Sequence, residues 1–395
     1  MTEHAREQEP RASAASFAVA VLFTIFVFST PAKWATLHLA SLLIVLSLAC
    51  STCSFWSAPA TRLYTRYTLI WLLPVVAATL AQHTLGLETA TRWSEQFTLI
   101  LRILGVGLGL LLLLDKQWIS LRRIGFIVIV CLVLHAAIGI SQWVTHSDSS
   151  LTAWRAIRID GIVGNPNPFG FFMALGVVLC ASLLRKDKES QAIRISLWMA
   201  TTIFVLAILG SGSRGAVIAA AAGMAVVFPP SSPRRIGVYI AILGTLASAY
   251  FVSNWQDTNA YSDGTRMAAL QFSLESIAQR PLTGWGFESF THLPNHSGIN
   301  SPHNMLLDLA LSSGVLTLAA FLVALALVTY TLGRSRAPLA RTLLALIAVA
   351  FVAGTFEYSV LSATHFRGPW VLIFALACHV VAGDDRNNGA QQPCA

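Results

Sequence analysis

Long apolar runs alternate with short polar segments along nearly the whole chain. The runs are continuous and lack the every-second-residue alternation of strands. An apolar helix of about 17 to 25 residues crosses the hydrocarbon core of a bilayer. The pattern therefore predicts an all-α, polytopic membrane protein with about 12 transmembrane helices. The predicted spans are residues 14–31, 34–55, 68–86, 95–114, 124–144, 166–184, 194–211, 214–230, 235–253, 305–332, 340–361 and 368–383.

The basic residues fall in every second loop between these runs, as the positive-inside rule requires. The alternate loops include Arg62 and Arg66, then Arg122 and Arg123, and they hold most of the 26 Lys and Arg residues. This distribution predicts that both termini lie in the cytoplasm.

Composition agrees with a membrane protein, because 55% of the residues are hydrophobic and only 11% are charged. The net charge of +8 is explained by topology, so no nucleic-acid partner is expected. No repeat or linker divides the chain. We therefore expect residues 1–395 to form a single integral membrane domain.

One polar insert interrupts the apolar runs, at residues 254–304. Its place in the loop order predicts a large periplasmic loop that carries part of an active site. Within it, Asp263 is expected to cap a helix over residues 265–278. Helical spacing of apolar residues gives that helix one apolar face, which would lie on the bilayer surface or on the spans; its members are Met267, Leu270, Leu274 and Ile277.

Arginines are unusual in outer loops, and several occur there after residue 150. Carboxylates could pair with some of them, but for the set we favour an anionic ligand. Arg214 follows Ser211-Gly212-Ser213, a break between two apolar runs that is too short for an exposed loop. A tight turn is predicted there. An arginine at such depth is costly unless it snorkels or binds a partner, which makes Arg214 a candidate site residue.

Two helix starts face the same side of the membrane. At the first, Asn165 is expected to cap the sixth span with Pro166 in its first turn, close to Arg158 and Asn167. Free N–H groups and the helix dipole would favour an anion there, although capping alone also explains the asparagines.

The second helix start is Ser301-Pro302-His303-Asn304. If Ser301 caps the helix, His303 lies in its first turn, where the dipole and nearby arginines disfavour a second positive charge. The imidazole would then be neutral and able to accept a proton, as a general base must.

Sequence motifs for common hydrolase, metalloprotease and nucleotide sites are absent. Outer carboxylates could still meet in space, but we expect arginines to supply the charge stabilisation that a metal gives elsewhere. Arginines and a neutral histidine suit glycan transfer from a lipid pyrophosphate to a hydroxyl group, because guanidinium groups bind phosphate oxygens in pairs.

The chain resembles the O-antigen ligase and polymerase family over roughly residues 155–315. The resemblance lies in these motifs: Arg158 with Gly161 and Asn165-Pro166-Asn167; Ser211-Gly212-Ser213-Arg214-Gly215; Arg266, then Arg280-Pro281-Leu282-Thr283-Gly284-Trp285-Gly286; and His303-Asn304 with Gly314.

The resemblance implies a glycosyltransferase of the bacterial inner membrane that needs no metal or other cofactor. Its partners would be an undecaprenyl-pyrophosphate-linked glycan donor, a lipid A-core acceptor and membrane lipids. The implied catalytic residues are His303, Arg214 and Arg266. The implied substrate-binding residues are Arg158, Arg280, Asn165, Asn167 and Asn304.

We predict an O-antigen ligase with its active site at the periplasmic face. Its nearest alternative is a polymerase of the same family, in which both substrates are lipid-linked repeat units. A transporter or flippase for anionic lipid-linked substrates is an alternative of another class. Transport would require polar residues through both halves of the chain, and the first five runs are nearly devoid of them.

Overall fold

The computed structural model describes residues 53–87, 93–117, 119–146, 158–185, 190–228, 258–287, 289–293, 302–356 and 364–389. Within these ranges all regular secondary structure is helical. The predicted spans 14–31 and 235–253, and nearly all of 34–55, lie outside them. The helices are α3 (Cys53–Ser57), α4 (Pro59–Thr84), α5 (Trp93–Asp115), α6 (Leu121–His146), α8 (Pro166–Leu184), α9 (Gln191–Ser211), α10 (Arg214–Val227), α12 (Thr258–Gln279), the 3-10 helix η1 (Ser289–His292), α13 (Met305–Ser313), α14 (Val315–Arg334), α15 (Ala340–Phe356) and α16 (Thr364–Gly389).

Several of these helices are long and apolar enough to cross a bilayer. Five meet both criteria in the described part of the chain, namely Pro59–Thr84, Leu121–Gln142, Pro166–Leu184, Gln191–Ser211 and Val315–Arg334. The protein is therefore a polytopic helical membrane protein, as the sequence predicts. The total of about 12 spans and the periplasmic side of the insert stay predictions.

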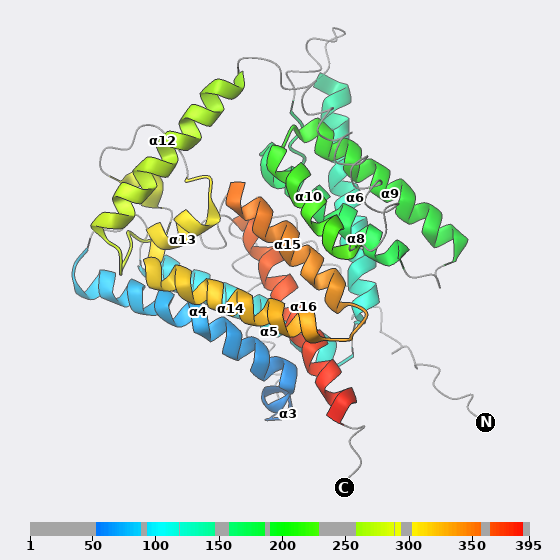
Figure 1. Ribbon diagram of the computed structural model, residues 1–395, viewed down its shortest axis with the longest axis horizontal. Coiled ribbons are helices and arrows are strands. Elements are labelled where there is room, and N and C mark those ends of the chain that lie inside the picture. The colour runs from blue at the N-terminus through cyan, green and yellow to red at the C-terminus, as the bar shows by residue number, and fades with distance from the viewer. Residues whose placement is uncertain are drawn as a thin grey trace.

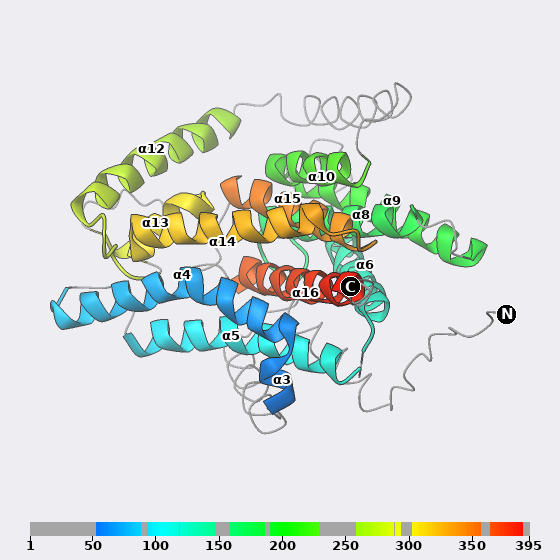
Figure 2. The same ribbon diagram turned by 60° about the horizontal axis from the view of Figure 1, so that its bottom comes forward.

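The long helices pack in two groups (Figures 1 and 2). In one group α4 contacts α5, α14 and α16; in the other α8, α9, α10 and α15 pack together, with α6 beside α8 and α9. Contacts of α15 with α14 and α16 join the groups. A single apolar core runs through both groups.

The predicted span 305–332 is wrong in one respect, because it is two helices. Gly314 has φ +84° and ends α13, and α14 then begins at Val315. The hydropathy is continuous through the break, which is why a pattern of apolar residues does not reveal it. The span predicted at 68–86 likewise begins earlier, at Pro59, where a proline suits the first helical turn.

Backbone pairing with the segment after α12 causes the break at Gly314. The N–H groups of Trp285 and Gly286 donate to the carbonyl oxygens of Leu311 (2.8 Å) and Ser312 (3.0 Å). In return, the N–H of Val315 donates to the carbonyl of Pro281 at 2.7 Å. These bonds replace the helical bonds that a continuous helix would make.

Two glycines permit this close approach. A Cβ on Gly284, which has φ +67°, would lie 2.6 Å from the carbonyl oxygen of Leu311. A Cβ on Gly314 would overlap the carbonyl of Leu282. Since the obstructing atoms are backbone, they cannot rotate aside as a side chain could. We call this pairing of residues 281–286 with 311–315 the glycine clamp.

Gly314→Ala should destabilise the protein by about 2 kcal/mol or more, since it adds a positive-φ penalty to a backbone collision. The measurement is thermal unfolding of the purified protein in detergent. Gly333→Ala is the matched control, because Gly333 also lies in the α13–α14 region and a Cβ there meets nothing within 4 Å. Equal unfolding temperatures for the two variants would contradict the clamp.

The helix of the polar insert differs from its prediction. It begins at Thr258 instead of at a cap formed by Asp263. The face that packs on α13 and η1 carries Ala269 and Phe272, whereas the predicted apolar stripe is largely exposed. Met267 is 65% and Leu274 53% exposed. Ile277 of that stripe packs against the cluster that contains Leu311 of α13, and contact with the bilayer surface stays the prediction for its exposed residues.

Candidate active site

The loop that precedes α8 is hydrogen-bonded, through Arg158, to the turn between α9 and α10. Arg158 donates from Nε to the carbonyl of Ser211 at 2.8 Å and from Nη2 to Oδ1 of Asn167 at 2.6 Å. The Asn165 side chain caps α8 by accepting from the N–H of Asn167 at 3.0 Å, as predicted. Arg158, Asn165 and Asn167 thus have structural partners, and substrate contact by them stays a prediction.

The predicted tight turn at Arg214 is confirmed. Gly212 ends α9 in the left-handed conformation with φ +60°, and Ser213 caps α10 by accepting from the N–H of Ala216 at 3.3 Å. Gly170 of α8 packs against this turn, because a Cβ there would lie 2.8 Å from Oγ of Ser211. Arg214 is therefore the first residue of α10, partly buried and held by a rigid backbone.

The end of α15 joins this turn to the start of α13. Gly215 packs on the side chain of Phe356, where an added Cβ would lie at 2.9 Å. The neighbouring Thr355 accepts, through its carbonyl, a hydrogen bond from Nδ2 of Asn304 at 3.1 Å. Because these contacts involve adjacent residues of α15, the backbone beside Arg214 and the backbone beside His303 lie at the same end of the bundle.

His303 precedes α13 instead of lying in its first turn. Its φ of +48° is not helical, and the helix begins at Met305. Asn304 is the cap, since its Oδ1 accepts from the N–H groups of Leu306 (2.9 Å) and Leu307 (3.2 Å). The expectation that Ser301 caps this helix is therefore wrong. Asn304 uses both ends of its amide within the protein, and substrate contact by it stays a prediction.

A neutral imidazole at position 303 is favoured for two reasons. Burial lowers the pKa of His303 below its ordinary value of 6.5, and the charge of Arg266 lowers it further. The dipole argument predicted the same direction, but desolvation is the larger cause. Arg266, on the partly buried side of α12, is thus close enough to His303 to act on it electrostatically. The structure brings together these two predicted catalytic residues.

Arg280 lies away from Arg266 and His303. It follows α12 directly, 14 residues after Arg266, so about 20 Å of helix rise separates the two. Its guanidinium carbon lies 3.7 Å from the centre of the Trp285 ring, a cation–π geometry. In turn Nε1 of Trp285 donates to the carbonyl of Ser276 at 2.8 Å. Arg280 therefore stabilises the end of α12 at the glycine clamp and does not join the cluster near His303.

A family model described as O-antigen ligase matches residues 199–322. Over these residues the chain is similar to the O-antigen ligase family. No curated protein matches the chain. Members of this family are glycosyltransferase-like enzymes, ligases or polymerases, that act on lipid-linked glycans. The resemblance stated from the sequence motifs is thereby confirmed.

We call the matched residues 199–322 the O-antigen ligase segment. It extends from α9 into α14 and contains Arg214, Arg266 and His303. It does not contain everything that shapes the site. Arg158 and the end of α15 both lie outside it, yet they hold the Arg214 turn and the Asn304 cap. The candidate site is therefore built by residues inside and outside the matched segment.

Sequence reasoning missed two glutamines, one buried and one partly buried, that hydrogen-bond to the backbone of loops. Gln82 of α4 is 2% exposed and donates from Nε2 to the carbonyls of Thr283 (2.6 Å) and Ser312 (3.2 Å), on the two sides of the glycine clamp. Gln142 of α6 donates to the carbonyl of Gly161 at 3.0 Å and accepts from its N–H at 2.9 Å. Each is a polar residue near the end of an apolar run, the one signal that could have revealed it.

Another residue without a sequence prediction is Asp308, in the first turn of α13. It is 3% exposed. A carboxylate is favourable at this end of a helix dipole. Among the described residues no group of three or more His, Cys, Asp or Glu side chains could hold a metal ion. Metal independence stays a prediction, because the side chains of Asp257, Asp263 and Glu288 lie outside the described ones.

The electrostatic contact between Arg266 and His303 predicts a change in pH dependence. A base must be neutral, so the rate falls as pH drops through the pKa of His303. Arg266→Gln removes a charge that lowers this pKa, so the acid side of the rate profile should move to higher pH. Burial remains, and the shift should therefore be partial. The rate of glycan transfer between pH 5 and 8 measures it.

Arg280→Gln is the matched control for that experiment. It removes the same charge from the same segment but far from His303, and the acid side of its profile should stay in place. A profile unchanged by Arg266→Gln, or moved equally by both variants, would contradict the assignment.

Proposed function

We propose that this protein is an O-antigen ligase. It would transfer polysaccharide from undecaprenyl pyrophosphate to a hydroxyl of lipid A-core at the periplasmic face of the inner membrane. The observation that carries the proposal is the pairing of His303, whose pKa is lowered, with Arg266 inside the O-antigen ligase segment. Gly215, beside Arg214, packs against the end of α15 that also lies near His303.

In the proposed reaction the acceptor hydroxyl attacks the anomeric carbon of the donor. The new C–O bond forms as the bond from that carbon to the pyrophosphate oxygen breaks. The hydroxyl proton passes to His303, and the bonding electrons leave with undecaprenyl pyrophosphate. His303 is the general base in this scheme.

Arginines would balance the charge of the leaving group. Guanidinium groups bind phosphate oxygens with two parallel N–H donors, and they do so more strongly where water is excluded. Arg214 and Arg266 are assigned this role. Arg158, with Nε and Nη2 bonded to the α9–α10 turn and to Asn167, is assigned the role of holding Arg214 in place.

The decisive experiment uses purified protein in detergent with a lipid-pyrophosphate-linked glycan and lipid A-core. An enzyme joins the two without any membrane gradient, whereas a transporter does not. The lipopolysaccharide pattern of a deletion strain then distinguishes the two family activities. Loss of a ligase leaves unsubstituted core, and loss of a polymerase leaves core with a single repeat.

A further inference from the structure

A polar hollow lies at the end of the bundle opposite the candidate active site. It has a volume of about 590 Å³, within the size range of ligand pockets. Three arginines line it: Arg185 at the end of α8, Arg336 in the α14–α15 loop, and Arg341 in the first turn of α15. We call it the arginine hollow. Arg341 lies in the first turn of α15 and Phe356 is its last residue. The length of that helix therefore separates the arginine hollow from the site at Arg214 and His303.

The backbone around the hollow is fixed. Arg185 donates from Nη1 to the carbonyl of Val227 at 2.9 Å. The Asp384 carboxylate accepts from Oγ of Ser335 and from the backbone N–H of Arg336, both at 2.9 Å. This carboxylate is therefore bonded to the loop itself, and no ion pair joins it to the Arg336 or Arg341 guanidinium in the described structure.

A second observation comes from Ser182, on the last turn of α8. Its side chain lines the hollow and is 6% exposed, yet its buried Oγ has no hydrogen-bond partner. A buried hydroxyl without a partner is costly. A ligand oxygen in the hollow would satisfy it. The wall thus offers a hydroxyl and three guanidinium groups to one anion.

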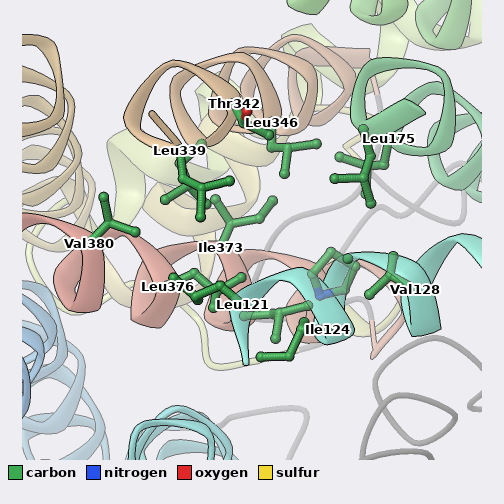
Figure 3. Close-up of a pocket in the computed structure, with 15 residues that line it drawn as sticks. Leu121, Ile124, Val128, Leu175, Leu339, Thr342, Leu346, Ile373, Leu376 and Val380 are labelled. Atoms are coloured by element: carbon green, nitrogen blue, oxygen red, sulfur yellow. The ribbon is translucent and has the colours of Figure 1, made fainter. Parts of the chain in front are cut away.

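An apolar cavity adjoins the arginine hollow. It lies among α6, α8, α15 and α16, and Thr342 lines both spaces. Figure 3 shows Leu339, just before α15, and Leu346 of α15 facing Leu121 of α6 and Ile373 of α16 across this space. Its volume of about 70 Å³ admits part of a hydrocarbon chain. The polar hollow and the apolar cavity therefore lie next to each other at Thr342.

We propose that the arginine hollow binds an anionic phospholipid of the surrounding bilayer. The phosphodiester lies among Arg185, Arg336 and Arg341, with Ser182 donating to one of its oxygens, and part of an acyl chain enters the apolar cavity. Basic pockets between transmembrane helices are suited to anionic headgroups. A small anion would satisfy the arginines but would leave the apolar cavity unexplained, which is why the lipid is favoured.

The test uses the full chain in detergent, incubated with equal amounts of phosphatidylglycerol and phosphatidylcholine, with retained lipids counted by native mass spectrometry. The wild-type protein should retain the anionic lipid in preference by about tenfold or more. The double variant Arg336→Gln/Arg341→Gln should lose that preference. Both side chains are exposed, so folding should survive, and an unchanged unfolding temperature without added lipid confirms it.

The matched control is Arg194→Gln/Arg334→Gln, which removes equal charge from exposed residues that do not line the hollow. It should keep the preference. Equal retention of both lipids by the wild-type protein would overturn the proposal, as would equal loss in the two double variants. The third measurement adds glycerol 1-phosphate as a soluble competitor of the bound lipid. If it displaces the lipid as effectively as free phosphatidylglycerol does, the site recognises a soluble phosphate and the proposal is wrong.

Discussion

His303→Ala should reduce glycan transfer by about 100-fold to 10,000-fold, the usual contribution of a general base. The loss should fall on the turnover rate, since the imidazole acts on the acceptor proton and not on donor binding. The measurement is the transfer rate of purified protein at saturating concentrations of both substrates. Protein level in the membrane and unfolding temperature should match the wild type, because Asn304, not His303, caps α13.

His83→Ala is the control for that experiment. His83 is an exposed histidine at the end of α4, beside Gln82, and no part of the mechanism uses it. It should leave the rate unchanged. Wild-type activity of His303→Ala would remove the imidazole from the mechanism. Loss of activity accompanied by loss of folded protein in both variants would point to packing instead of chemistry.

Arg214→Ala should reduce donor turnover by about 100-fold or more, as expected for losing one charged group that stabilises a leaving group. Arg214→Lys keeps the charge but loses the paired N–H donors, so it should fall between the wild type and Arg214→Ala. The comparison measures turnover and apparent affinity for the lipid-linked donor in all three proteins. Equal activity of the two variants would refute a phosphate contact by this arginine.

Substitutions at position 214 should change the backbone little, so differences in activity between Arg214→Ala and Arg214→Lys can be assigned to the side chain. Arg214 is the first residue of α10, and the cap bond of the helix is made by Ser213. Alanine and lysine both suit a helix, so neither should disturb the turn. A fall in unfolding temperature for Arg214→Ala alone would show that the guanidinium stabilises the fold.

Features with a local cause could be predicted from the sequence. The Asn165 cap with its following proline and the Gly212 turn follow from preferences of a few adjacent residues, and the structure has both. Polytopic helical character follows from apolar run length in the same way. The order of motifs, from Arg214 to His303, was enough to predict the similarity that the family model finds over residues 199–322.

Features with a distant cause could not be predicted. The break at Gly314 depends on hydrogen bonds to residues 281–286, about 30 positions away, and hydropathy is continuous through it. The start of α13 shifted for a related reason, because Asn304 is held by Thr355 of α15. The face that α12 buries is likewise chosen by α13 and η1. In each case tertiary contacts override a local preference.

The exposed stripe of α12 has a consequence for kinetics. Met267 and Leu274 point away from the protein on the same helix that carries Arg266. With that stripe in the lipid headgroup zone, the helix would hold its guanidinium at the depth where the phosphates of a polyprenyl carrier travel. The donor would then arrive by lateral diffusion, and its half-saturation point would scale with its mole fraction in the micelle or vesicle. Adding inert phospholipid at constant donor molarity would slow the enzyme by surface dilution.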